Sequence, residues 1–408
     1  MKCRICGNES LKNFLSLGKM PLANSFLSKQ ELTQDEKSFP LETCFCGNCK
    51  LVQLSYVVPA EMMFKNYVYV SSTTNTFKVH FTKMAEDISR NFTLNEDSLA
   101  VDIGSNDGIL LKGFQRMKVQ TIGVEPAVNI AAIAEQNGVE TINDFFGEAS
   151  VNEIIRRKGQ ADVVTATNVF AHVNDIHDFV ANVKSLLKKD GIFVIEVPYL
   201  VTMFEKMLFD TIYHEHLSYF SLTSLNHFFG MLGMQVFDVQ NVDSHGGSLR
   251  VFVEKNDGKF KINPSVTAML KNEKEFGVDN FALYKQFADK VYNTRHNLVM
   301  CLKDLKGKGN AIAAYGAPAK GNTLLNFCQI GTEYISYVVD DNPLKIGLYT
   351  PGMHIPVVSS KNLEEQKPDY ILILAWNFAK EIMEKTKKLE DGGVKFIIPL
   401  PEVVVLPR

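Results

Sequence analysis

The sequence predicts an α/β protein with a small cysteine-rich N-terminal segment, a central parallel sheet and a second α/β unit at the C-terminus. Three observations support this architecture. Five of the seven cysteines fall within the first 49 residues. Strand-like and helix-like segments alternate over residues 96–255, and a similar alternation follows a long amphipathic stretch. We place the three domains at residues 1–65, 66–255 (with a helical connector over 66–95) and 256–408.

The composition excludes several classes of partner. The chain has 408 residues and a formal net charge of −3, and it has no basic tract, so we expect no nucleic-acid partner. No apolar run reaches the roughly 18 residues needed to cross a bilayer. The first residues lack the apolar region of a signal peptide. We therefore expect a cytoplasmic monomer that does not contact membranes.

Two CxxC pairs in the N-terminal segment predict a structural zinc site. Cys3 and Cys6 form one pair, and Cys46 and Cys49 form the other. Four thiolates complete a tetrahedral shell and leave no open position for catalysis. Cys44 is an alternative to Cys46 as ligand, although Cys46 supplies the matching spacing. Buried, reduced cysteines without a metal are the other interpretation.

The central domain reads as a parallel sheet that ends in an antiparallel pair. The final two strand-like segments are joined by a loop too short for a helix, so they are expected to pair antiparallel. This layout is typical of S-adenosylmethionine methyltransferases. The predicted strands cover residues 98–104, 121–125, 161–166, 191–197, 234–239 and 248–254.

The loop after the first of these strands is the expected site for the methyl donor. Asp102, Gly104, Asn106 and Gly108 belong to it, and its glycines lack the GxGxxG spacing of dinucleotide folds. Glu125 ends the second strand, where a carboxylate accepts from both ribose hydroxyls. An NAD-binding domain is the alternative, and the missing GxGxxG speaks against it.

Further polar residues follow the later strands, where ligands of open α/β sheets bind. They are Asn168, His172, Glu196 and Tyr199. Next along the chain comes a dense titratable stretch, which includes Tyr213, His214, Glu215 and His216. Its tyrosine and histidines can transfer protons near neutral pH when their surroundings tune them. A purely structural loop, or a metal-binding pair formed by His214 and His216, are the alternatives.

The C-terminal domain is predicted to contain a second doubly wound sheet. Its first strand ends in a glycine turn that carries Tyr315, Lys320 and Asn322. Lysine and backbone amides at such a turn suit a phosphate group, while an ordinary glycine turn is the alternative. The stretch expected to be helical covers residues 281–306, and the expected strands fall within 311–315, 334–341 and 369–375.

Taken together, these motifs resemble the bacterial sugar C-methyltransferases that act on nucleotide-linked keto-deoxysugars, with the tetronitrose-type C-3′-methyltransferase closest in layout. The similarity covers nearly the whole chain, and Cys44 is the one unusual feature. It implies a zinc domain, a methyl-donor domain, and a thymidine-diphosphate-sugar held between the second and third domains. The matching segments are the CxxC pairs and residues 102–108, 168–172, 213–219, 245–250 and 317–322.

The resemblance also implies how the site works. His216 is expected to remove the proton beside the 4-ketone, because a carbon becomes nucleophilic only as an enolate. Tyr213, helped by His172, is expected to donate to the enolate oxygen, and Glu215 to orient His216 or bind a sugar hydroxyl. The residues expected at the sugar nucleotide are Tyr67, Glu196, Tyr199, His245, Arg250, Tyr315, Lys320 and Asn322.

Three other functions remain open from the sequence. An O- or N-methyltransferase uses the same donor site, and methylation at C-5 or another carbon uses the same enolate chemistry. A non-enzymatic zinc scaffold or an RNA-binding protein is a third possibility, against which the donor loop and the titratable stretch argue. The sugar, the carbon, the nucleotide and the stereochemistry depend on the shape of the pocket.

Overall fold

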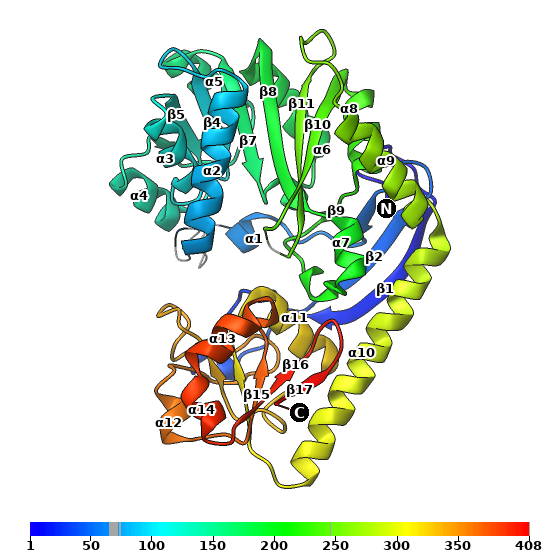
Figure 1. Ribbon diagram of the computed structural model, residues 1–408, viewed down its shortest axis with the longest axis vertical. Helices are drawn as coiled ribbons and strands as arrows, with labels where there is room; N and C mark the ends of the chain where they lie inside the picture. Colours follow the sequence, from blue (N-terminus) through cyan, green and yellow to red (C-terminus); the bar gives the residue numbers. More distant parts are fainter. Residues whose placement is uncertain (65–71, 73–74, 245, 408) are drawn as a thin grey trace.

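The computed structural model describes residues 1–64, 72, 75–244 and 246–407, so Tyr67 and His245 lie outside the described residues. The described chain forms sheets of four, seven and six strands with helices packed around them (Figure 1). This arrangement confirms the predicted α/β class. Among the described residues, no helix combines the length and the apolar character needed to cross a bilayer.

The central sheet has the strand order β10-β11-β8-β7-β4-β5-β6. The five strands from β8 to β6 in this order run parallel. Strands β10 and β11 pair antiparallel with each other, and β11 pairs antiparallel with β8. The predicted antiparallel finish is thus confirmed. The strands are β4 (Leu99–Ile103), β5 (Gln120–Val124), β6 (Thr141–Ile142), β7 (Ala161–Thr167), β8 (Leu187–Pro198), β10 (Met234–Val242) and β11 (Ser248–Lys255).

Apolar residues on both faces of this sheet explain why helices cover it twice. Val163 packs in the core beneath α2 and α3, whereas Val164 packs in the core beneath α5 and α6, because successive strand residues point to opposite faces. The helices are α2 (Asn75–Asn91), α3 (Ile109–Arg116), α4 (Val128–Gln136), α5 (Glu148–Lys158), α6 (Ile176–Leu186), α7 (Leu200–Glu205) and α8 (Leu222–Met231), with the short helices η3 (Phe170–His172) and η4 (Phe209–Thr211).

The N-terminal sheet has the order β1-β2-β3-β9 and takes its last strand from the central part of the sequence. Strand β9 (Ser218–Tyr219) pairs antiparallel with β3, so the segment after His216 is built into the N-terminal sheet. The other elements of this domain are β1 (Leu11–Met20), β2 (Phe39–Cys46), β3 (Val52–Leu54), η1 (Glu31–Thr33) and α1 (Glu61–Phe64).

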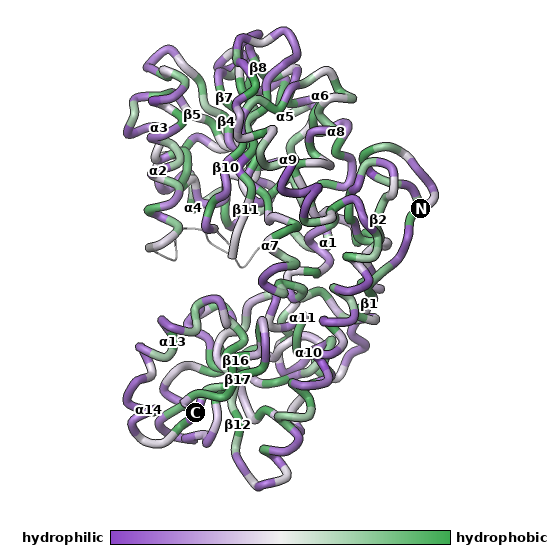
Figure 2. Tube along the Cα trace, turned by 45° about the vertical axis from the view of Figure 1, so that its right-hand side comes forward, coloured by the Kyte–Doolittle hydropathy of each residue, from purple (hydrophilic) through white to green (hydrophobic). Residues whose placement is uncertain are grey.

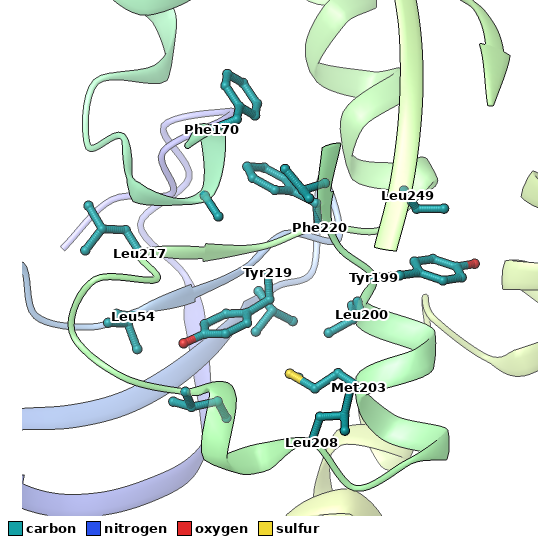
Figure 3. Packing of buried hydrophobic residues seen from close by; sticks show 14 of the residues in the cluster. Leu54, Phe170, Tyr199, Leu200, Met203, Leu208, Leu217, Tyr219, Phe220 and Leu249 are labelled. Carbon is teal, nitrogen blue, oxygen red and sulfur yellow. The ribbon is translucent and has the colours of Figure 1, made fainter. Parts of the chain in front are cut away.

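The side chains of this shared segment pack across the two domains (Figure 3). Leu217 and Tyr219 lie on the side of Leu54, and Phe220 lies beneath Phe170, with ring centroids 5.3 Å apart. All five residues are buried. Burial of this much apolar surface fixes the N-terminal sheet against the central domain.

The C-terminal sheet has the order β14-β13-β12-β15-β16-β17, parallel except for β17. The tube in Figure 2 is green along β16 and β17 and mostly purple at α14, as expected for a buried sheet with an exposed helix. The elements are β12 (Ile312–Tyr315), β13 (Val338–Val339), β14 (Val357–Val358), β15 (Tyr370–Ile373), β16 (Lys395–Ile398), β17 (Val404–Leu406), α11 (Ala319–Cys328), α12 (Asn362–Glu365), η5 (Trp376–Phe378), α13 (Ala379–Lys385) and α14 (Lys387–Asp391).

One expected strand of this domain is much shorter than predicted. The sequence over residues 334–341 suggested a full strand, but β13 spans two residues, because Tyr334 and Ile335 donate to Gly331 O and form a turn. The predicted long helix is confirmed as α10 (Phe281–Gly307), which follows α9 (Pro264–Phe276). Helix α10 runs along one side of the molecule and spans the central and C-terminal domains (Figure 1).

The carboxyl ends of the central strands point toward the C-terminal domain (Figure 1). There α11, which follows β12, contacts η4 of the central domain. Trp376 at the end of β15 donates from Nε1 to Asp210 Oδ2 over 2.7 Å. The edges where the two sheets are expected to bind ligands are therefore joined through the segment that leads into Tyr213 and His216.

Candidate active site and cofactor sites

The four predicted zinc ligands converge in the N-terminal domain. The Sγ atoms of Cys3, Cys6, Cys46 and Cys49 all lie within 4.8 Å of one another. This donor set fits a tetrahedral thiolate site for zinc. The Cys3 and Cys49 Sγ atoms lie 3.3 Å apart, and this contact lowers the pKa of the Cys3 thiol.

Cys44 lies apart from this cluster. Its Sγ donates to Gln53 O over 3.4 Å, and burial raises the pKa of its thiol to about 12. Cys46 therefore completes the metal site, as the matching spacing suggested. Within the described part of the chain, the four cysteines are the sole group of three or more side chains that could hold a metal ion.

The donor loop after β4 has the backbone geometry that its glycines allow. Gly104 has a φ of +63°, and a Cβ there would stand 2.4 Å from Val169 Cγ2. Gly108 has a φ of +79° and lies just before α3, where a Cβ would meet Val139 at 2.7 Å. Side chains at either position would strain the backbone and clash with a neighbouring valine, so this conformation of the loop requires glycine at both positions.

Two buried carboxyl groups flank this loop. Asp102 Oδ1 accepts from Thr165 Oγ1 over 2.6 Å, and burial raises the pKa of Asp102 to about 7. Glu125 accepts from the backbone amides of Asn106 and Ala127, each over 2.9 Å, and burial raises its pKa. Glu125 thus braces the loop from the end of β5, with its carboxylate at the edge where a ribose is expected.

Several buried polar atoms around the loop fit a bound donor molecule. Ser105 Oγ, Asp107 Oδ1 and Asn168 Oδ1 have no hydrogen-bond partner among the described residues. Buried polar atoms are rarely left unpaired, so their position at the ends of β4 and β7 suits a polar ligand. Asn168 has a φ of +57°, and its amide donates to Glu196 O over 2.7 Å, which bends the chain after β7.

The predicted proton-transfer residues come together. The rings of His172 and His216 have centroids 5.0 Å apart, and those of Tyr213 and His216 have centroids 4.1 Å apart. Phe64 stacks on the other side of His172 at 5.6 Å. All three titratable side chains are half-buried, so their rings are held by packing but remain open to a substrate.

The tautomer of His216 follows from one hydrogen bond. Its Nδ1 lies 2.7 Å from Thr211 O, and a carbonyl oxygen can only accept. Nδ1 therefore carries the proton, and in the neutral ring the lone pair resides on Nε2. This tautomer is the one that a base acting through Nε2 would need.

The neighbours of His216 in the sequence have other contacts. Glu215 is buried and accepts at Oε1 from Asn24 Nδ2 over 2.6 Å. His214 Nε2 lies 3.2 Å from Phe39 O, and burial lowers the pKa of its imidazole. A buried, neutral His214 that donates to β2 anchors the segment to the N-terminal domain, which answers the open question of its role.

Two expected substrate residues are instead paired with each other. Arg250 donates from Nε and Nη2 to Glu196 Oε2 over 3.1 and 2.9 Å, and both side chains are buried. His80 and Ser244 hold Glu196 Oε1 at 2.8 and 2.7 Å. Burial opposes ionisation, but these partners prevail and lower the pKa of Glu196 to about 2. The pairing offsets the charge of Arg250, which was expected at the sugar nucleotide.

Tyr199, which was also expected at the sugar nucleotide, directly follows β8. It is 7% exposed, and burial together with the carboxylate of Glu273 raises its pKa. Figure 3 shows its ring turned away from Tyr219. Its place at the end of β8 was predictable from the sequence, but the direction of the side chain depends on packing against α9.

The expected residues of the C-terminal domain are distributed around the end of its sheet. Lys320 donates to Asn377 Oδ1, and its Nζ lies 5.0 Å from the ring centre of Trp376. Asn322 is fully buried and donates from Nδ2 to Ala23 O over 2.7 Å. The hydroxyl of Tyr315 lies farther along the edge, where it donates to Asp341 over 3.1 Å in place of a ligand contact.

Sequence reasoning missed four residues that contact this site. They are Asn24, His80, Asp210 and Trp376, which bond to Glu215, Glu196 and each other. Asp210 stood in the titratable stretch, and Trp376 is the single tryptophan of the chain, so both carried a weak signal. Asn24 and His80 belong to no recognisable sequence motif, and only the fold brings them to the site.

Family models match nearly the whole chain. One described as "Putative zinc binding domain" matches residues 3–64, one described as "Methyltransferase domain" matches residues 78–239, and one described as "C-methyltransferase C-terminal domain" matches residues 243–401.

Individual proteins are similar to the whole chain or to parts of it. The C-methyltransferase NovU of Streptomyces niveus is 37% identical over 405 residues, which cover 99% of this chain and 96% of NovU. A ubiquinone biosynthesis O-methyltransferase of Rhodopseudomonas palustris (strain TIE-1) is 32% identical over 129 residues, 30% of this chain and 50% of that protein. The solved magnesium protoporphyrin IX methyltransferase of Synechocystis PCC 6803, with bound SAM, aligns at 10% identity and a TM-score of 0.34, covering 46% of this chain and 88% of that one.

Proposed function

This chain belongs to the C-methyltransferase family, and from that premise we propose that it methylates C-3 of a nucleotide-linked 4-keto-deoxysugar by way of an enolate. It is an S-adenosylmethionine-dependent methyltransferase with a zinc-binding domain. The sugar nucleotide, dTDP-linked or similar, and the position of the methyl group are the parts we propose. Methylation at C-5 is the second candidate, because C-3 and C-5 both flank a C-4 ketone.

The observation that carries the proposal is the orientation of His216. Its Nδ1 donates to Thr211 O, so in the neutral ring Nε2 is the nitrogen whose lone pair can accept a proton. Such a base suits removal of a proton from carbon, and the match of residues 243–401 to the C-methyltransferase C-terminal domain favours C-methylation over O- or N-methylation.

The residues around His216 suit the developing charge. In our proposal Tyr213, with help from His172, donates to the oxygen that becomes negative as the proton leaves carbon. Support comes from the short ring separations of 4.1 and 5.0 Å to His216. Glu215 binds a sugar hydroxyl or orients the base. S-adenosylmethionine, when bound, supplies the electrophilic methyl group, and alignment of the two substrates provides much of the rate.

The roles proposed for the other residues depend on which of the two sheets they belong to. We propose that Asp102, Gly104, Asn106, Gly108, Glu125 and Asn168 hold the donor, as the loop geometry supports. We propose that Lys320 attracts the diphosphate from the C-terminal side, where Asn322 and Tyr315 shape the edge. Tyr67 and His245 keep their predicted substrate roles. Glu196 and Arg250 act together as a buried pair beneath the site, and Tyr199 supports it from the core.

A direct assay tests this function. The protein is incubated with S-adenosylmethionine and a panel of dTDP-4-keto-6-deoxyhexoses, together with their 4-hydroxy and 4-amino counterparts. We expect the mass of one methyl group to be added to a keto sugar, with NMR locating it on C-3. Transfer to the hydroxy or amino compounds instead would contradict C-methylation, and a methyl group on C-5 would select the second candidate.

A further inference from the structure

The loop between β1 and β2 reaches from the zinc-binding domain to residues 213–217, which carry Glu215 and His216 and are called the catalytic segment below. Asn24 lies in this loop, at a turn in which Ser25 N donates to Leu22 O over 3.0 Å. From this turn Asn24 Nδ2 donates to Glu215 Oε1 over 2.6 Å, across 191 positions of sequence. Glu215 is 5% exposed, so a protein group takes the place of water at its carboxylate.

We propose that Asn24 is a positioning residue of the active site, which acts by orienting Glu215. A hydrogen bond to an ionised carboxylate is shorter and stronger than one between neutral groups, and it favours the charged form. The amide therefore holds Glu215 in one orientation beside His216. The inference rests on the proposed function, because it matters only if Glu215 takes part in the reaction.

The backbone that carries Asn24 is itself held by the C-terminal domain. Asn322, fully buried on α11, donates to Ala23 O over 2.7 Å. Leu27 forms a bridge with Tyr349, in which each amide donates to the other's carbonyl over 3.0 and 2.8 Å. A side chain on such a backbone is placed before any substrate arrives, which is what an oriented catalytic group requires.

The catalytic segment is also tied to the N-terminal domain on either side of Glu215. His214 contacts Phe39 O, as described above. Arg4, which lies between the first two zinc ligands, donates from Nη1 to Leu217 O over 3.0 Å. These contacts fix the backbone of the segment, whereas Asn24 contacts a side chain proposed to act on the substrate. The zinc-binding domain thereby contributes a residue to the chemistry as well as a support.

The test compares matched asparagine variants in the full-length, zinc-loaded protein. Asn24→Ala removes the donor, and Asn24→Asp keeps the shape but places a second carboxylate against Glu215. Asn13→Ala and Asn13→Asp make the same changes at an exposed position of β1 and serve as controls. The readouts are kcat, the KM of a dTDP-4-keto-6-deoxyhexose, the Kd of S-adenosylmethionine, deuterium exchange into the sugar, and Tm.

We expect Asn24→Ala to lower kcat and exchange about 10-fold and Asn24→Asp to lower them about 100-fold, because small misplacements of catalytic groups are this costly. Donor affinity and Tm should stay close to those of the Asn13 controls. In a Glu215→Gln background, Asn24→Ala should lower kcat by less than about 2-fold, since the effects of residues that act through each other are not additive.

Three outcomes would overturn the inference. Asn24 variants that match the Asn13 controls in kcat and exchange would show that the contact has no part in the reaction. A fall in Tm with kcat preserved would make Asn24 structural. Full additivity with Glu215→Gln would show that Asn24 does not act through Glu215. Failure of the unaltered protein to turn over or exchange any keto sugar would instead contradict the proposed function.

Discussion

The imidazole rings of His172 and His216 lie with their centroids 5.0 Å apart, because a hydrogen bond joins the backbone beside one ring to the backbone beside the other. Leu217 N donates to Ala171 O over 2.8 Å, which holds the segment after His216 against η3. Tyr213 completes the group from a turn in which His216 N donates to its carbonyl. The three side chains are thus placed by main-chain bonds, and small substitutions among them should change chemistry without disrupting the fold.

Replacement of His216 by alanine should abolish proton removal from carbon. The group with a lone pair on Nε2 is lost, so we expect deuterium exchange at the sugar carbon to fall by at least about 100-fold. S-adenosylmethionine should bind with unchanged affinity, measured by calorimetry. His296→Ala, at an exposed position of α10, provides the control. Unchanged exchange in His216→Ala would rule this residue out as the base.

The Tyr213→Phe substitution should slow enolate formation while leaving binding of the nucleotide intact. Loss of one donor to a developing oxyanion typically costs about 100-fold in rate. The measurement is the exchange rate together with the Kd for dTDP, and Tyr56→Phe at an exposed site is the control. A large loss of dTDP affinity with an unaffected exchange rate would count against the oxyanion role.

Zinc content should distinguish Cys46 from Cys44. Cys46→Ser removes one of four converging thiols, so we expect loss of zinc and a lower Tm, because binding of a structural metal is coupled to folding. Cys44→Ser keeps a donor that can reach Gln53 O, and it should retain the metal. Elemental mass spectrometry of the purified proteins provides the readout. Equal zinc loss in both variants would show that Cys44 is a ligand.

The buried pair of Glu196 and Arg250 should make stability depend on pH below neutrality. The pKa of Glu196 is lowered to about 2 in the fold, so its contribution is fully present above its unfolded pKa and is lost as pH falls toward 2. A shift of this size corresponds to about 3 kcal/mol. The difference in unfolding free energy between the unaltered protein and Glu196→Gln should therefore shrink from about pH 5 downward. A constant difference in urea titrations would contradict this linkage.

Removal of Arg250 alone should lower the free energy of unfolding more than removal of both Arg250 and the charge of Glu196. Arg250→Met leaves Glu196 buried with less compensation, and such losses typically cost about 3–5 kcal/mol. The double variant Glu196→Gln/Arg250→Met should recover part of that stability. Chemical denaturation of the two variants checks the order, and a double variant less stable than Arg250→Met would mean that the pair stabilises the fold through other contacts.

Local sequence patterns were enough to predict most elements. The stretch expected to be helical over residues 281–306 is α10 (Phe281–Gly307), since its apolar residues recur at helical spacing. The short β13 was not predictable in length, because an apolar run does not reveal the turn at Gly331. The zinc ligands were predictable for a related reason, since two residues separate the cysteines of each pair and a tight loop brings such neighbours together.

Local features of this protein were determined by the sequence, whereas contacts between residues far apart in the sequence were decided only by the tertiary structure. Sequence alone determined the fold class, the four thiols and the titratable character of the segment at His216, because these depend on composition and local spacing. The fold decided that Asn24 meets Glu215, and that Arg250 is neutralised by Glu196. Such pairs depend on which side chains the packed domains bring within 3 Å or so, and on which charges lose their water. A local pattern of residues encodes neither the distance between such side chains nor the loss of water from their charges.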